Sequence, residues 1–138
     1  MSPRILIPCV GLFLVALIIP LLSVATQPTV VELAADGVQR AEVIADSYSY
    51  TPDYLIVKPN IPVELSLQSK TWLVPHTFVL KDAEAGLDIK QDIPAGKRVL
   101  ITFTPTRPGT FTFYCDKRLL FFKSHEDRGM KGTLEVKN

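Results

Sequence analysis

The sequence has few of the side chains that bind transition metals. It contains two cysteines, two histidines and two methionines in 138 residues, and Cys9 lies in an apolar N-terminal stretch. It also has no excess of positive charge, because 15 Lys and Arg residues are balanced by 14 Asp and Glu residues. Nucleic-acid binding needs a basic excess, so nucleic acid is not expected as a partner. There is no internal repeat and, after residue 25, no sustained helical periodicity, which argues against repeat and helical folds.

The N-terminal segment is typical of a protein that leaves the cytoplasm. Arg4 precedes the almost wholly apolar residues 5–24, and Ser23-Val24-Ala25 offers small residues for cleavage after Ala25. We therefore predict a signal peptide over residues 1–25 and a single domain over residues 26–138. The apolar run approaches the length that spans a bilayer, so an uncleaved membrane anchor over residues 5–25 is the alternative. Both interpretations predict a periplasmic or otherwise extracytoplasmic location.

Short segments with an apolar residue at every second position run through residues 26–138. Val63–Leu67, Val99–Phe103 and Phe111–Cys115 follow this strand pattern. Turn residues such as Pro, Gly, Asp and Asn separate the segments. Further strands are predicted at residues 30–35, 41–48, 54–57, 76–80 and 132–136, with a short helical turn within 83–90. The pattern predicts an all-β, antiparallel sandwich of seven or eight strands.

The scarce metal-binding side chains are concentrated in two places. Cys115 ends a predicted strand on its apolar face, His125 and Met130 follow in the connection to the last strand, and His76 begins another strand after Pro75. A thiolate, two imidazoles and a thioether suit a copper ion that changes between Cu(I) and Cu(II). Zinc would accept the thiolate and imidazoles but has little use for a thioether.

Each of these residues also has a simpler interpretation. A single buried cysteine is more often a small apolar side chain than a ligand, Met130 could fill the core, and both histidines could lie at the surface. The two histidines are the only ones in the chain, and one of them shares a short segment with Cys115 and Met130. This coincidence favours one copper ion bound by His76, Cys115, His125 and Met130.

Three separated segments resemble the cupredoxins, the small blue copper proteins that include plastocyanin-like and pseudoazurin-like members. The segments are Ala45–Lys58, Pro75–Leu80 and Pro108–Val136. The resemblance implies a Greek-key β-sandwich over residues 26–138. It also implies His76, Cys115 and His125 as copper ligands with Met130 as the axial ligand. One departure is large, since residues 116–124 separate Cys115 from His125 by many more residues than in plastocyanin-like loops. Closing a longer loop costs little free energy, so His125 can still return to the metal.

The long Cys–His connection contains four consecutive apolar residues, Leu119–Phe122. In one interpretation they fold back and keep water away from the copper. In the other they are exposed beside His125 and dock a redox partner protein, as the resemblance implies for this region, or a membrane. The neighbouring Lys117, Arg118 and Lys123 would suit an acidic protein partner or anionic lipid. The sequence does not choose between these interpretations.

Together these features predict an exported mononuclear copper protein that carries one electron at a time. The alternative is a copper-binding or copper-delivery protein of the same fold, and a metal-free adhesion or assembly module is a third candidate. We expect no enzymatic activity, because Met130 would fill the remaining coordination position and no other acid–base or nucleophile cluster is present.

Overall fold

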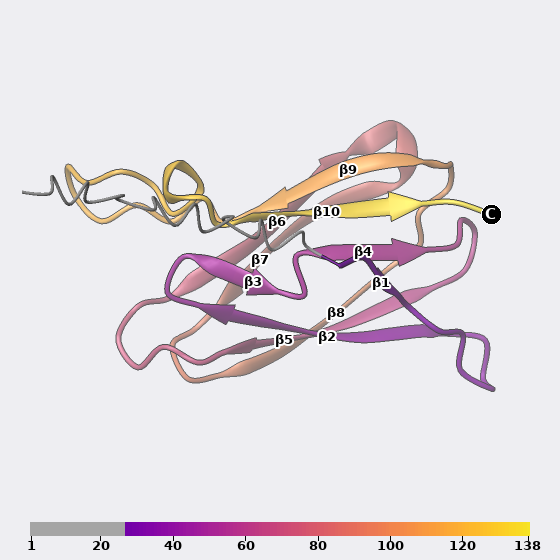
Figure 1. Ribbon diagram of the computed structural model, residues 1–138, viewed down its shortest axis with the longest axis horizontal. Coiled ribbons are helices and arrows are strands. Elements are labelled where there is room, and N and C mark those ends of the chain that lie inside the picture. The colour runs from indigo at the N-terminus through magenta and orange to yellow at the C-terminus, as the bar shows by residue number, and fades with distance from the viewer. Residues whose placement is uncertain (1–26) are drawn as a thin grey trace, which may run out of the picture.

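The computed structural model of the protein describes residues 27–138 (Figure 1). In this part of the chain it has ten strands and two short 3-10 turns. In chain order they are β1 (Thr29–Val30), β2 (Gln39–Asp46), β3 (Ser49–Thr51), β4 (Tyr54–Val57), β5 (Val63–Ser69), β6 (His76–Asp82), η1 (Ala83–Ala85), β7 (Leu87–Ile93), β8 (Arg98–Phe103), β9 (Gly109–Tyr114), η2 (Glu126–Arg128) and β10 (Lys131–Val136).

The strands form two sheets that face each other. One sheet has the order β1-β4-β10-β9-β6-β7 and the other has the order β3-β2-β5-β8. The predicted all-β sandwich is confirmed, with two more short strands than the upper end of the expected range. The pairing is mixed rather than wholly antiparallel, because β1–β4, β4–β10 and β2–β5 pair in parallel. Between β2 and β5 the chain crosses into the opposite sheet at β4, and it therefore returns to its first sheet running in the original direction.

Alternating apolar residues build the core between the sheets. Along β5 every second residue is buried, from Val63 to Ser69. In β9 the rings of Phe111 and Phe113 are buried, and Cys115 continues the same alternation just beyond the strand end. The core cluster consists only of residues between Val31 and Val136. Within the described residues these side chains form one continuous core between the sheets.

Three predicted elements differ from the structure. Only the first residues of 83–90 form a helical turn, capped by the Asp82 carboxylate and ended by Gly86; the rest joins β7, because pairing with β6 outweighs weak helical propensity. The predicted strand 41–48 ends earlier, at Asp46 in β2, and a turn with positive φ at Ser47 leads to β3, which begins at Ser49. Of residues 30–35, only Val30 lies in a strand, and Leu33 makes an isolated bridge.

The predicted signal peptide or anchor, residues 1–25, lies outside the described residues. Among residues 27–138 no helix has the length and apolar character needed to cross a membrane.

Three connections meet at one end of the sandwich. β5 and β9 end there, β6 and β10 begin there, and the β2–β3 hairpin lies at the same end because β2 runs parallel to β5. This is the left end in Figure 1, where the long connection between β9 and β10 extends beyond the sheets. Both histidines and Cys115 lie in or next to these connections.

Candidate metal centre

His76, Cys115 and His125 come together in one buried cluster. Their possible ligand atoms lie within 4.8 Å of one another. His76 and Cys115 are fully buried, and His125 is 6% exposed. The Sγ of Cys115 lies 3.4 Å from Nδ1 of His125, and the two imidazole rings are 5.3 Å apart between centroids. Three of the four predicted ligands are therefore placed to bind one ion.

Cys115 is fixed by its own strand and by two neighbouring segments. Its backbone N–H donates to the carbonyl of Met130 at 3.1 Å, which continues the β9–β10 ladder past the strand ends. The backbone N–H of Thr77 donates to Sγ at 3.3 Å, and the Thr77 hydroxyl lies 3.5 Å from the same sulfur. The hydrogen bond from the Thr77 N–H is of the kind that tunes the properties of a cysteine sulfur bound to a metal.

His76 is held by one ring nitrogen, which leaves the other available. Its Nε2 lies 3.1 Å from the hydroxyl of Thr71, and that hydroxyl donates its proton to the carbonyl of Val74. Because the Thr71 proton is already used, Nε2 must carry the hydrogen and donate to Thr71. Nδ1 then has a lone pair, and it is a buried atom without a hydrogen-bond partner. An unpartnered buried acceptor is costly in a folded protein unless a ligand satisfies it, and a metal ion would do so.

The backbone brings His125 back to Cys115 despite the long connection. The N–H of His125 donates to the carbonyl of Lys117 at 2.9 Å, and the N–H of Glu126 donates to the carbonyl of Cys115 at 3.1 Å. These two bonds form a neck that closes the connection at its base, so residues 118–124 loop out beyond it. The edge of the Tyr48 ring packs against the imidazole at 5.1 Å. The expectation that a longer loop can return His125 to the site is confirmed.

Met130 lies next to the cluster along the chain and is fully buried. Its carbonyl accepts from Cys115, and its own N–H donates to the carbonyl of His125 at 2.9 Å. Gly129 precedes it with positive φ and ends η2. Backbone hydrogen bonds thus hold Met130 next to Cys115 and His125. The role of Met130 as a metal ligand stays a prediction.

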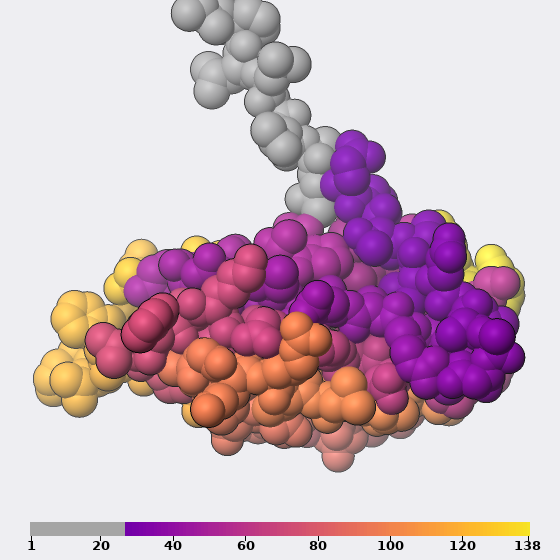
Figure 2. Space-filling view, turned by 90° about the horizontal axis from the view of Figure 1, so that it is seen from below, coloured from indigo at the N-terminus to yellow at the C-terminus, as the bar shows by residue number. Residues whose placement is uncertain are grey.

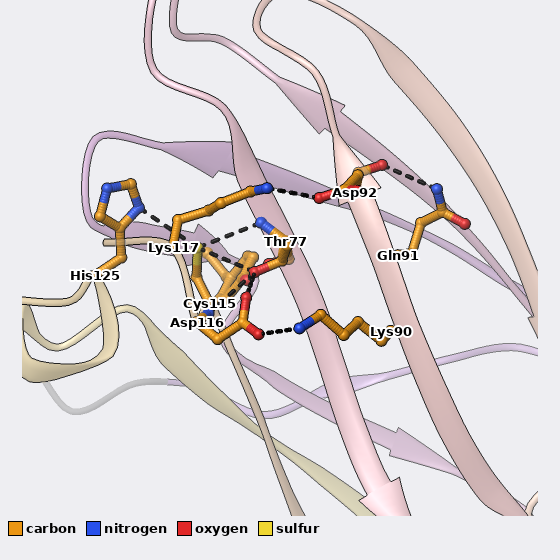
Figure 3. A network of polar contacts seen from close by, with 9 residues as sticks. Thr77, Lys90, Gln91, Asp92, Cys115, Asp116, Lys117 and His125 are labelled. Carbon is orange, nitrogen blue, oxygen red and sulfur yellow. Dashed lines mark hydrogen bonds and ion pairs between the residues drawn. The ribbon is translucent and has the colours of Figure 1, made fainter. Parts of the chain in front are cut away.

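A polar network supports the cluster on the side of β6 (Figure 3). The Thr77 hydroxyl donates to the carboxylate of Asp116 at 2.6 Å and accepts from the Asp116 N–H at 3.0 Å. Asp116 also pairs with Lys90, and Lys117 pairs with Asp92 at 2.7 Å. Burial acts to raise the pKa of Asp116, but the hydrogen bonds from Lys90 and Thr77 outweigh it and lower the pKa. The carboxylate therefore stays ionised and holds Thr77 in place beside the sulfur.

Both histidines are held in the neutral form that can bind a metal. Burial lowers the pKa of His76 to about 4, with a smaller effect from the neighbouring His125. Burial also lowers the pKa of His125, helped by the positive charges of Arg128 and Lys117. Neutral imidazoles and a thiolate are the protonation states that metal binding needs.

The sequence did not identify the residues that position the ligands. Thr71, Thr77 and Asp116 are ordinary polar residues in the sequence, and only their closeness to His76 or Cys115 along the chain could have drawn attention to them. Tyr48, which contacts His125, lies 77 positions earlier in the chain, and no sequence pattern pointed to it.

The four apolar residues of the insert do not cover the site. Leu119, Leu120, Phe121 and Phe122 are 67%, 74%, 101% and 58% exposed. The interpretation in which two or more of them fold back over the cluster is therefore wrong. The neck explains this outcome, because it already returns His125 to the site and directs the intervening residues away from the core.

A groove of about 350 Å³ lies between the insert and the β5–β6 connection. Leu73 and Val74 of the β5–β6 connection, Leu119 and Phe122 of the insert, and His125 are among the residues that line it. Of the three clustered residues, His125 alone lines this groove. It is thus the part of the site that lies closest to the surface.

The fold and the cluster agree with a known family. A family model described as a cupredoxin-like domain matches residues 12–136. The chain belongs to the cupredoxin-like family. A comparison with curated proteins gives no match, so the remaining similarities come from solved structures.

Solved structures that resemble this cupredoxin include copper-binding domains and blue copper proteins. The metal-binding domain of the Cu(I)-exporting P-type ATPase CopA of Streptococcus pneumoniae D39, determined with Cu(I), has a TM-score of 0.62 and 19% identity, and the match covers 83% of this chain and 99% of that domain. Auracyanin A, a blue copper protein of Chloroflexus aurantiacus, has a TM-score of 0.57 and 19% identity over 73% of this chain and 100% of its own. A mutant fern plastocyanin has a TM-score of 0.51 and 26% identity over 70% and 100%.

The residues present fit copper. Copper prefers soft and borderline donors. The Cys115 sulfur, 3.4 Å from Nδ1 of His125, and the unpartnered buried Nδ1 of His76 are donors of this kind. The family and this donor set indicate copper as the metal of the cluster.

Proposed function

We propose that this cupredoxin is an exported mononuclear copper protein that carries one electron at a time. The observation that carries the proposal is a buried set of one cysteine and two histidines, of which only His125 reaches the surface groove. Bound copper would supply the change between Cu(I) and Cu(II). The apolar residues 5–24 support export, which places the domain in the periplasm or another extracytoplasmic compartment.

The chain holds the ligands so that they move little. Thr77 and the Met130 carbonyl fix Cys115, Thr71 fixes His76, and the neck fixes His125. A site that is held by its surroundings needs little rearrangement when the charge of the metal changes, which favours fast electron transfer. We assign Met130 as the axial ligand, since a weak thioether completes a trigonal set of one thiolate and two imidazoles.

The number of cysteines in the domain favours a site with a single copper ion. Cys115 is the only cysteine of residues 27–138, whereas a dinuclear site bridged by cysteines needs two. The route for electrons is the His125 imidazole, because it links the cluster to the groove. We expect a redox partner protein to approach this end of the domain, where Leu119–Phe122 are exposed.

The proposal is tested by the colour and redox behaviour of the copper-loaded protein. Copper(II) should give an intense visible band from charge transfer between the Cys115 sulfur and the metal. Cys115→Ser should abolish the band while the domain stays folded, because the change replaces one small buried side chain by another. Reversible cycling in a redox titration is expected for a carrier. A wild-type protein that binds copper(II) but stays colourless would contradict the proposal.

Copper delivery is the second candidate function. It is favoured by the structural similarity to a domain of a Cu(I)-exporting ATPase determined with Cu(I). A delivery protein would hold copper as Cu(I) and release it to a competing chelator within the time of an exchange experiment. A carrier would keep its copper under the same conditions in both oxidation states.

A further inference from the structure

Two apolar tips extend from the metal-site end of the domain. The first consists of Trp72 and Leu73 in the β5–β6 connection, and they are 92% and 90% exposed. The second consists of Leu119–Phe122 in the insert, where Phe121 is fully exposed. We call these segments the apolar tips. Leu73 of the first tip and Leu119 and Phe122 of the second line the same groove beside His125, so the two tips lie near each other. In Figure 2 the light-orange atoms of this part of the chain protrude at the left end of the molecule.

Exposure on this scale is unusual for a soluble surface. Single exposed apolar residues are common, but a contiguous group of large ones marks a contact with a protein or a membrane. Phe121 and Trp72 have almost no contact with the rest of the domain. The backbone of the insert makes a tight turn here. Leu120 has positive φ, and the Phe122 N–H donates to the Leu119 carbonyl. These side chains therefore do not stabilise the fold by packing against the core.

The charges around the tips are positive. Lys117, Arg118 and Lys123 flank the second tip, Lys70 precedes the first, and neither segment, 70–75 nor 117–123, contains an acidic residue. Two acidic residues outside these segments contact the cations of the second tip. Asp92 pairs with Lys117, and Asp127 lies 3.6 Å from Arg118. Apolar residues at a tip with cations behind them match a lipid surface, where apolar groups enter the acyl region and cations meet anionic headgroups.

The direction of the chain points to the same side. β1 runs parallel to β4 and β10, and β10 begins directly after Met130 at the metal-site end. The N-terminal end of β1 is therefore directed toward that end. The apolar residues 5–24 end only a few residues before Thr29 in the sequence. If this segment is retained in a membrane, so short a connection holds the metal-site end close to the bilayer.

We propose that the apolar tips insert into an anionic lipid surface, with the His125 groove facing the membrane. Two separate projecting tips can both enter a deformable lipid layer. A flat surface on a protein partner would accommodate them less well. In this orientation His125 meets partners that are embedded in the membrane or move along it. The inference does not depend on electron transfer, since the tips and their charges belong to the chain whether or not metal is bound.

The only tryptophan of the chain, Trp72, reports directly on this contact. The exported protein, as purified and with its copper reduced, is mixed with vesicles of phosphatidylcholine containing 30% phosphatidylglycerol or with vesicles of phosphatidylcholine alone. We expect Trp72 emission to shift to shorter wavelength on the anionic vesicles, and to be quenched when the acyl chains carry bromine. The shift should be much smaller on the neutral vesicles. Because the signal comes from Trp72, it reports contact at the tip even if residues 1–25 are retained.

Matched variants distinguish binding through the apolar tips from non-specific binding to the vesicles. The double change Leu120→Ser and Phe121→Ser should weaken vesicle binding, measured from Trp72 quenching, at least about tenfold, because burial of one aromatic side chain is already worth more than that factor. Leu100→Ser is the control, since Leu100 is 61% exposed on β8 outside the tips; it should change nothing. Arg118→Glu with Lys123→Glu should remove the preference for anionic vesicles. Both sets of changes lie on exposed side chains, and circular dichroism verifies the fold.

Two results would overturn the proposal. The first is Trp72 emission that anionic vesicles do not change, which would leave the tips to a protein partner. The second is quenching that the tip changes do not weaken. Neither result affects the copper assignment, because a protein that fails the vesicle test can still show the visible band of the loaded site. Loss of that band with intact vesicle binding would conversely contradict only the proposed function.

Discussion

Acid should destabilise the metal-free protein through His76. The side chain is fully buried, its Nδ1 has no hydrogen-bond partner, and His125 lies beside it. Burial is the main reason why the pKa falls from 6.5 to about 4 in the folded state, and a positive charge on His125 would act in the same direction. The unfolded chain therefore takes up this proton at higher pH than the folded chain does.

The sign and the size of the effect follow from this difference in pKa. Because the folded form resists protonation, the stabilisation is fully present above pH 6.5 and is lost as pH falls toward 4. Each unit of pKa difference is worth about 1.4 kcal/mol, so the fall from 6.5 to about 4 gives an upper limit of about 3.5 kcal/mol for His76. Below pH 4 the contribution should level off, since both states are then protonated.

Urea unfolding of metal-free protein at pH 7, 6, 5 and 4 measures this effect. Buried and paired carboxylates also titrate in acid, so the useful quantity is the difference between wild type and His76→Gln, which has no titrating group at this position. We expect the difference in the free energy of unfolding to shift in favour of the variant by about 2–3 kcal/mol between pH 7 and pH 4. A difference that stays constant over this range would show that His76 is protonated as easily in the fold as in the unfolded chain.

Three further predictions concern other parts of the site and its frame. Met130→Leu should keep copper bound but raise its reduction potential in a spectroelectrochemical titration, because a weak donor that favours copper(II) is lost; an unchanged potential would remove Met130 from the ligand set. Gly132→Ala should lower the free energy of unfolding in urea by about 1–3 kcal/mol, since a Cβ there would lie 2.3 Å from the Phe113 ring. A variant in which residues 117–123 are shortened to a few residues should still bind copper in a competition assay, because the insert supplies none of the predicted ligands; loss of copper would show that the insert shapes the site.

The sequence predicted the three side chains that cluster, because their placement follows local rules. The period of two in Phe111–Cys115 places the cysteine on the core side of its strand, and the structure confirms its burial. Pro75 fixes the start of the strand that carries His76. Such placements depend on neighbours along the chain, which the sequence displays directly.

The sequence could not predict contacts between distant segments. The outward course of Leu119–Phe122 depends on two backbone hydrogen bonds at the neck, and backbone groups have no signature in side-chain patterns. The parallel pairing of β2 with β5 depends on a crossover between the two sheets. β7 was missed because its residues Leu87–Ile93 gain their strand form from pairing with β6 and not from a strong pattern of their own.

The neck also separates the frame of the cluster from the exposed insert. The bonds from His125 to Lys117 and from Glu126 to Cys115 close the frame of the site before and after the insert. We therefore expect that residues 118–123 can change in polarity without moving His125, provided that these two bonds remain. The copper site then depends on the frame, whereas the choice of protein or lipid contact depends on the insert. Breaking the neck would couple the two properties again, because every motion of the exposed tip would then reach the histidine ligand.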